Sequence, residues 1–130
     1  MGQQQLLLIV LGVIIVGIAV VVGINVFTAS ASSSNRDAIT ADLTNLAAMA
    51  QQYYRKPTAL GGGGNSFDKF AIPATLQQTA NMSAVVTATA GTTTGISFTA
   101  KGTEDGTTAG SKTSVTVAVT PTGITTSINN

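Results

Sequence analysis

An uninterrupted apolar segment from Leu6 to Ile24 constrains the fold of this 130-residue chain more than any other feature. At about 1.5 Å rise per residue, a helix over this segment measures roughly 28 Å, close to the hydrocarbon core of a bilayer. It has no polar face, so it needs apolar surroundings on every side. The rest of the chain, mostly Thr, Ser, Ala and Gly, is too small to enclose it. We therefore expect lipid or further copies of the same helix around this segment.

Three other interpretations of the segment are open. A secretory signal peptide needs a basic start and a shorter apolar core; the first basic residue here is Arg36, although residues 29–31 resemble a cleavage site. A permanent single-pass anchor usually carries basic residues on its cytoplasmic flank. Residues 1–5 carry no charged side chain, which indicates that a basic leader was removed or was never needed. The third interpretation is a buried helix of a larger heteromeric complex.

A second helical pattern follows the polar residues 29–37. Apolar residues recur at steps of three and four and mark one stripe of an amphipathic helix: Ile39, Leu43, Leu46, Ala47, Ala50, Tyr53 and Tyr54. Pro57 and the glycines at 61–64 are stop signals. We predict one long helix through residue 56, loosened near Gly23 and residues 30–34. Its first half is apolar all round and its second half is amphipathic.

The C-terminal part alternates like strands, at 84–89, 95–100, 114–120 and 123–128. Turns are expected at 91–94 and at 101–111, and the tetraglycine at 61–64 is interpreted as a flexible connection. The predicted fold class is α+β, with the long N-terminal helix packed against a small antiparallel sheet. Its expected parts are residues 1–28, 29–57 and 58–130. The predicted helix–sheet contacts are Ile39, Leu43, Leu46, Ala50 and Tyr53, and the residues expected to pin the loop are Phe67, Phe70, Ile72 and Leu76.

The side-chain inventory excludes most chemistry. Only 8% of residues are charged and the net charge is +1, which argues against a nucleic-acid binder. The absence of Cys and His removes thiolate chemistry and the commonest general base and metal ligand. We expect no enzymatic activity, no cofactor, no metal and no small-molecule substrate. Glu104 and Asp105 are interpreted as turn residues, and Asn81 begins a possible N-glycosylation triplet.

The predicted order is an apolar helix, its amphipathic extension, a glycine loop and a small sheet. In this order the chain resembles processed type IV pilins and pseudopilins. The similarity in sequence is confined to residues 1–26, whereas the similarity in the order of helix, loop and sheet extends over the whole chain. The resemblance implies a basic leader cut after a glycine, a methylated N-terminus, and a helix that leaves the membrane for the core of a filament whose shell is made by the sheets. The chain has Gln5 where the family usually has glutamate, and Val22 where bacterial members often have proline. It also lacks the paired-cysteine loop of many members.

The predicted function is that of a structural subunit of an extracellular type IV pilus-like filament, serving adhesion, surface attachment or motility. The expected partners are many copies of the same chain, with the inner or cytoplasmic membrane holding the subunit before assembly. Gln3, Gln4 and Gln5 are expected to form polar contacts between subunits. The alternatives are a membrane-anchored extracytoplasmic domain that does not polymerise and a minor pseudopilin. The predicted core contacts are Leu6, Leu7, Leu8, Ile9, Val10, Leu11, Val13, Ile14, Ile15, Val16, Ile18, Val20, Val21, Val22 and Ile24.

Overall fold

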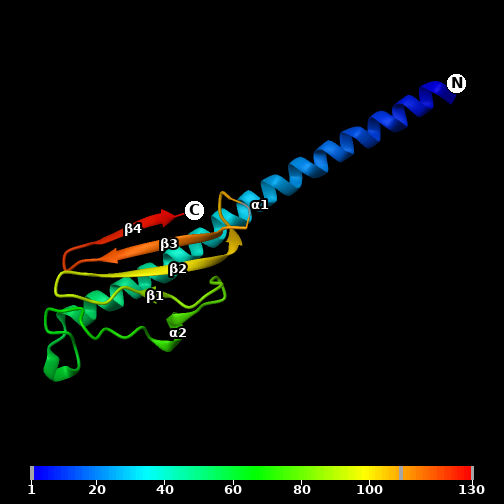
Figure 1. Cartoon of the computed structure of the whole chain (residues 1–130). Coiled ribbons are helices and arrows are strands. Elements are labelled where there is room, and N and C mark those ends of the chain that lie inside the picture. Colours follow the sequence, from blue (N-terminus) through cyan, green and yellow to red (C-terminus); the bar gives the residue numbers. More distant parts are fainter. Residues whose placement is uncertain (1, 109, 130) are drawn as a thin grey trace. The chain divides into compact units, whose positions relative to one another are not determined.

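The computed structural model describes residues 2–108 and 110–129 and confirms the α+β class (Figure 1). The chain divides into two compact units, an N-terminal unit (Met1–Ala31) and a C-terminal unit (Ser32–Asn130), and α1 runs through both. The elements are, in order, α1 (Gly2–Arg55), a short 3-10 helix (Thr58–Leu60), α2 (Ala74–Gln77), β1 (Thr87–Ala88), β2 (Ile96–Asp105), β3 (Lys112–Val119) and β4 (Ile124–Asn129).

Helix α1 is continuous over its 54 residues. The predicted loosening near Gly23 and residues 30–34 is therefore wrong. No proline interrupts this range, and a helical glycine costs only about 1 kcal/mol relative to alanine. The helix also includes the polar residues after the apolar run: the Thr28 hydroxyl donates to the Ile24 carbonyl at 2.9 Å, and Ser32 is buried.

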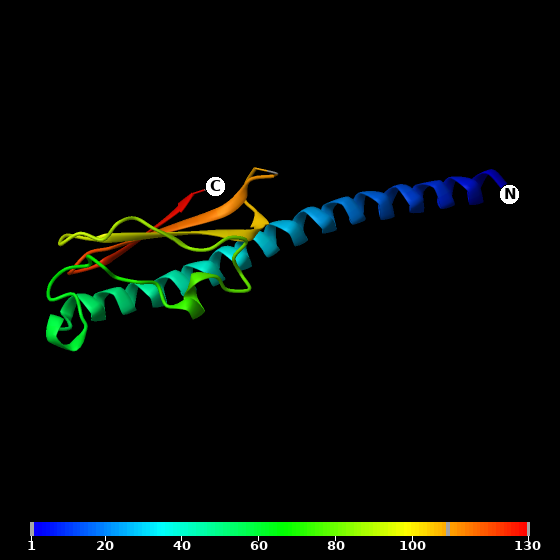
Figure 2. The ribbon, with the colours of Figure 1, turned by 60° about the horizontal axis from the view of Figure 1, so that its bottom comes forward.

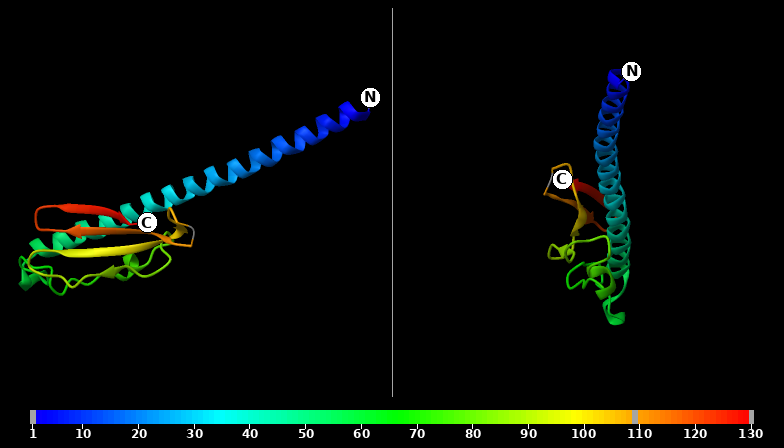
Figure 3. Two further views of the ribbon diagram at one scale, coloured as in Figure 1. Left: turned by 45° about the horizontal axis from the view of Figure 1, so that its top comes forward. Right: turned by 90° about the vertical axis from the view of Figure 1, so that its right-hand side faces the viewer.

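The four strands form one antiparallel sheet in the order β1-β2-β3-β4, so each strand lies beside its neighbour in the sequence. Strands β2 and β3 make the longest pairing, which begins with Ile96 opposite Val119 and, after a register shift beyond Lys101, ends with Asp105 opposite Lys112. Strand β4 pairs with β3 without a register shift, from Val119 opposite Ile124 to Ser114 opposite Asn129. The sheet is a single layer, and the part of α1 that belongs to the C-terminal unit lies along one of its faces (Figures 2 and 3).

Two of the predicted boundaries are wrong. The strand predicted at 84–89 shrinks to Thr87–Ala88, because the Val86 amide donates to the Gln77 carbonyl at 2.7 Å and so leaves the ladder. The sequence predicts a turn at residues 101–105, which include Glu104 and Asp105. In the structure these residues continue strand β2 instead. Gly102 lies within this strand, where a Cβ would overlap the Asn35 side chain of α1. This glycine therefore permits close helix–strand packing rather than a turn.

The core lies between the amphipathic stripe of α1 and the inner face of β2 and β3. On β3 every second residue is buried, from Thr113 to Val119. The buried apolar side chains are Ile39, Leu43, Leu46, Ala47, Ala50, Phe67, Met82, Val86, Ile96, Phe98, Ala100, Val115, Val117 and Val119. An isolated sheet of this size is marginal, so the helix supplies apolar area that the strands lack.

The glycine loop closes the C-terminal end of α1. The last carbonyls of a helix have no intrahelical partner, and here Gly63 N donates to Tyr53 O at 2.8 Å, while Asn65 N donates to Tyr54 O at 2.8 Å. A Cβ on Gly63 would overlap Ser66 O and meet the Tyr53 ring. The tetraglycine is therefore a packed cap on the helix, unlike the flexible connection predicted.

Aromatic residues fasten the following loop to the core. Phe67 is fully buried and stacks on Tyr54 with ring centroids 4.7 Å apart. Phe70 contacts both Tyr53 and Phe98 edge to face, at 5.4 and 5.7 Å. Phe70, Ile72 and Leu76 are partly buried against the core cluster, so the predicted pinning residues all lie against it.

We predict that Leu43→Ala destabilises the C-terminal unit far more than Leu60→Ala. Leu43 is fully buried, whereas Leu60 is 67% exposed. A leucine-sized cavity costs about 2–5 kcal/mol of unfolding free energy, and an exposed substitution about 0.5 kcal/mol or less. Denaturant unfolding of the full chain in detergent, followed by the fluorescence of its two tyrosines, measures both. Equal losses in the two variants would contradict this core.

Candidate functional site

The largest exposed apolar surface in the described chain lies on the N-terminal unit. All fifteen side chains predicted as core contacts, from Leu6 to Ile24, are 52–69% exposed. They point in all directions around α1, because the apolar run has no polar face. The stretch is long and apolar enough to cross a membrane by length and composition. Such a surface is unstable in water, so it is the first candidate for a binding or insertion site.

The apolar surface extends beyond the predicted limit at Ile24. Val26 is 64% exposed and Phe27 is 76% exposed, and Asn25 is the one polar residue between Ile24 and Val26. The apolar segment predicted from the sequence ends at the first polar residue and so misses these two residues. Helical spacing nevertheless places Val26 beside Val22. At the other end, Gln3, Gln4 and Gln5 are exposed on the first turns of α1. Met1, which bears on the predicted processing, lies outside the described residues.

The predicted helix–sheet residues lie in the C-terminal unit. Ile39, Leu43, Leu46 and Ala50 are at most 1% exposed and belong to the core cluster. Tyr53 is half-buried, and its hydroxyl donates to the Asp68 carbonyl at 3.1 Å. This residue therefore joins the helix end to the loop.

Asn81, the predicted glycosylation residue, lies in a turn and is half-buried. Its Nδ2 donates to Asp42 Oδ2 at 3.4 Å, and its carbonyl accepts from Asn35 Nδ2 at 2.9 Å. Asp42 also accepts from the Thr79 hydroxyl at 2.7 Å. These contacts tie the turn to α1, and glycosylation of Asn81 remains a prediction.

The sheet face opposite the helix carries a row of hydroxyl groups. Thr87 pairs with Thr99, Thr99 with Thr116, and Thr116 with Ser127, so one row crosses all four strands. The Thr99 and Thr116 hydroxyls lie 3.0 Å apart, and Asn129 Nδ2 donates to Thr116 at 3.2 Å. Directly opposed residues share a face. Alternation along a strand predicts which of its residues face the solvent, but the alignment of these hydroxyl groups into one row follows only from the register.

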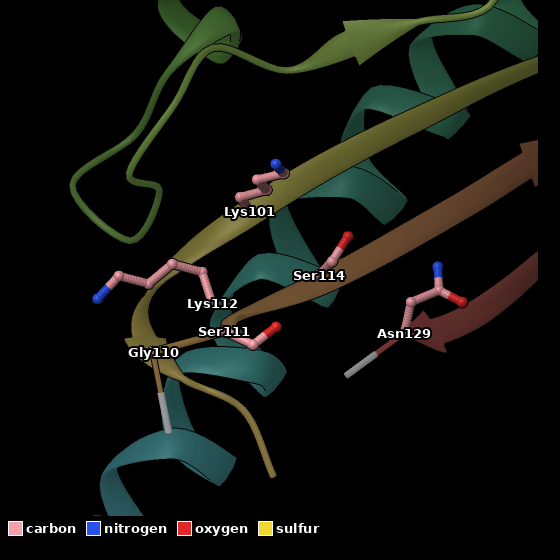
Figure 4. A pocket seen from close by; sticks show the side chains of 6 residues that line it. All are labelled: Lys101, Gly110, Ser111, Lys112, Ser114 and Asn129. Atoms are coloured by element: carbon pink, nitrogen blue, oxygen red, sulfur yellow. The ribbon is translucent and has the colours of Figure 1, made fainter. Parts of the chain in front are cut away.

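An open hollow of about 440 Å³ lies where the β2–β3 turn approaches the end of β4 (Figure 4). Lysine, serine and amide side chains line it, and the Lys112 side chain extends away from Ser114 and Asn129. Its ammonium is already engaged, with Thr103 O at 2.7 Å and Asp105 Oδ1 at 3.2 Å. The hollow offers hydrogen-bonding groups on a solvent-facing surface, and the described residues that line it include no acid–base pair.

Asp105 is held at the start of this turn. Its Oδ2 accepts from Gly110 N at 3.0 Å, and Lys112 lies beside its other oxygen. The Gly110 N–H first, and the Lys112 ammonium second, lower the pKa of Asp105 below its ordinary value of 3.8. Hydrogen bonds and a nearby positive charge both favour the carboxylate.

The described part of the chain contains no group of three or more His, Cys, Asp or Glu side chains that could hold a metal ion. The chemical features that the structure brings together are therefore surfaces: the apolar helix, the hydroxyl face and the edges of the sheet.

No protein-family model matches the chain, and neither a curated protein nor a solved structure matches it. The layout, with a long apolar N-terminal helix and a small antiparallel sheet packed on α1, is compatible with a pilin-like fold.

We predict that the Asp105 carboxyl titrates below pH 3.8. Since its folded pKa is lowered, its stabilising contribution is present above the unfolded pKa and is lost as the pH falls through the folded value. Carbon-13 NMR titration of the Asp105 carboxyl in the full chain measures this directly. In Lys112→Met the pKa should rise only partway, because the Gly110 hydrogen bond remains. An ordinary pKa in the unmodified chain would contradict the geometry of the turn.

Proposed function

We propose that this chain is the structural subunit of an extracellular, type IV pilus-like filament that polymerises through the N-terminal half of α1. The observation that carries the proposal is the exposure of every large apolar side chain from Leu6 to Phe27. Burial of each Val, Leu or Ile away from water is worth roughly 1.5–3 kcal/mol, so copies that have left the membrane would be held together strongly by packing of their helices. The C-terminal unit, which has its own core, would form the shell.

A second function has support from the same helix. Its apolar length suits a bilayer, so the chain could remain a membrane-anchored extracytoplasmic domain that does not polymerise. In the filament proposal the membrane holds the subunit only before assembly. A minor pseudopilin would use the same helix in a short stack. Electron microscopy of surface material sheared from cells that express the chain distinguishes long fibres of this subunit from the other two outcomes.

Glycines on α1 allow a sharper test that leaves membrane insertion intact. A Cβ at Gly12, Gly17 or Gly23 would meet nothing within 4 Å in the single chain. Gly17→Leu therefore adds apolar surface and helix propensity without a clash in the subunit. Packed helices, by contrast, approach closely at small residues, so a leucine side chain should interfere with neighbouring copies.

We predict that Gly17→Leu is retained in the membrane fraction but loses most of its fibres. Immunoblotting of membranes and negative-stain microscopy of sheared material measure the two effects separately. Val16→Leu, which adds only one methylene at the neighbouring position, is the control and should assemble nearly normally. Full membrane retention with normal fibre yield in Gly17→Leu would count against close helix packing in the polymer.

The glutamines at the start of α1 provide an independent prediction. Inside an apolar assembly, unpaired amides are costly, so Gln3, Gln4 and Gln5 are expected to hydrogen-bond across subunits. Replacing all three with leucine should lower the melting temperature of the fibres or change their helical register. Gln52→Leu, at an exposed position of α1 in the C-terminal unit, is the control. Unchanged stability and register by thermal melting and electron cryomicroscopy would contradict this role.

A further inference from the structure

The two edges of the sheet differ in how they are covered. On the β1 side, the chain from residue 82 to 89 runs along β2: Met82 bridges Gly102, and Ser83 N donates to Lys101 O at 2.9 Å. On the other side, β4 is the last strand, and its six residues are all exposed. Natural sheets usually protect such an edge with charges, prolines or bulges. Strand β4 contains no charged residue or proline, and its pairing with β3 has no register shift.

The inner face of β4 lies outside the cover provided by α1. Ile124, Thr126 and Ile128 are opposite Val119, Val117 and Val115, so they lie on the sheet face that packs against the helix. The three valines are at most 1% exposed, whereas Ile124 is 37% and Ile128 is 49% exposed. The apolar face of the sheet therefore continues one strand beyond the core.

The backbone groups of these same residues point away from β3. Thr120 N donates to Gly123 O at 2.8 Å and makes this a hydrogen-bonded pair. Hydrogen-bonded and non-bonded pairs alternate along an antiparallel ladder. Consequently Thr125, Ser127 and Asn129 bond toward β3, and the N–H and C=O groups of Ile124, Thr126 and Ile128 face the open edge.

We propose that β4 pairs antiparallel with β4 of a second copy of this chain, about a two-fold axis at Thr126. In this register Ile124 lies opposite the partner's Ile128, and Thr126 lies opposite its own copy. On the other face Thr125 lies opposite the partner's Ser127. The strand is thus self-complementary, as a two-fold interface requires: apolar meets apolar, hydroxyl meets hydroxyl, and no like charges face each other.

The size of the contact fits copies held at high local concentration. One six-residue strand pair is smaller than the roughly 1,200–2,000 Å² interface of a stable complex, so a single contact is weak and gains by repetition. A two-fold contact does not itself build a fibre, and it stands or falls independently of polymerisation through α1. Between subunits that already form fibres, it would join neighbouring fibres laterally.

Cysteine cross-linking of the full chain in detergent micelles tests this register, since the chain contains no cysteine. In the proposed pair the two Thr126 Cα atoms lie about 5.5 Å apart, within the range of a disulfide. Two copies of Ser127 are diagonal neighbours at about 7–8 Å, beyond that range. Under mild oxidation Thr126→Cys should form a covalent dimer, and Ser127→Cys should remain at background. Equal cross-linking at both positions, faster reaction at Ser127→Cys, or no dimer at all would overturn the proposal.

A charge exchange at the axis gives a second measurement that does not depend on disulfide geometry. Thr126→Lys places like charges directly opposite each other and should weaken association by up to about fivefold, as should Thr126→Asp. A one-to-one mixture of the two variants should recover it, because opposite charges then meet. Thr125→Lys, on the same exposed strand, is the control: it faces the partner's Ser127, its own copy is only a diagonal neighbour at about 7–8 Å, and it should weaken association less. Sedimentation velocity in density-matched detergent reports all four; no recovery in the mixture would overturn the two-fold pairing.

Discussion

Burial of one stripe of α1 against the inner face of β2 and β3 is the interaction on which the C-terminal unit depends. A small antiparallel sheet is marginal in water unless something covers its apolar face. Here Ile39, Leu43, Leu46 and Ala50 provide that cover, and they meet Phe98 and the valines of β3 in one core. The cap at Gly63 and the aromatic contacts of the following loop then close the end of the helix. The other described elements are arranged around this packing.

The same packing determines which surfaces remain exposed. One helix covers two strands, so β4 keeps an apolar inner face and an open backbone edge. The opposite sheet face presents hydroxyl groups that partly satisfy one another. Earlier in α1 the one-sided stripe gives way to an apolar surface on all sides, which no single sheet could cover. The sequence contains no Cys or His and few charged residues. The exposed apolar surfaces are therefore the features on which the proposals of association with lipid and with other copies are based.

Much of the architecture was predictable because its signals are local. The spacing from Ile39 to Ala50 indicated an amphipathic helix, and alternation placed β3 and β4 to within about two residues. Two of the errors arose where another segment of the chain changed the local preference. Gly102 looked like a turn residue, but it lies in a strand that Asn35 of α1 approaches closely. Val86 looked like a strand residue, but its amide bonds to Gln77. Asn35 is far away in the sequence and Gln77 belongs to the preceding helix α2, so neither contact follows from the local pattern.

By itself the sequence determined that the segment from Leu6 to Ile24 is a helix without a polar face, because hydrophobicity and the absence of proline act locally. It also excluded chemistry that depends on Cys or His. Only the tertiary structure decided that Ile124 and Ile128 share a sheet face with buried valines while lying beyond the helix. The strand pattern alone cannot distinguish these isoleucines from core residues. Their exposure depends on strand order, register and the width of the covering helix, which are relations between residues far apart in the chain.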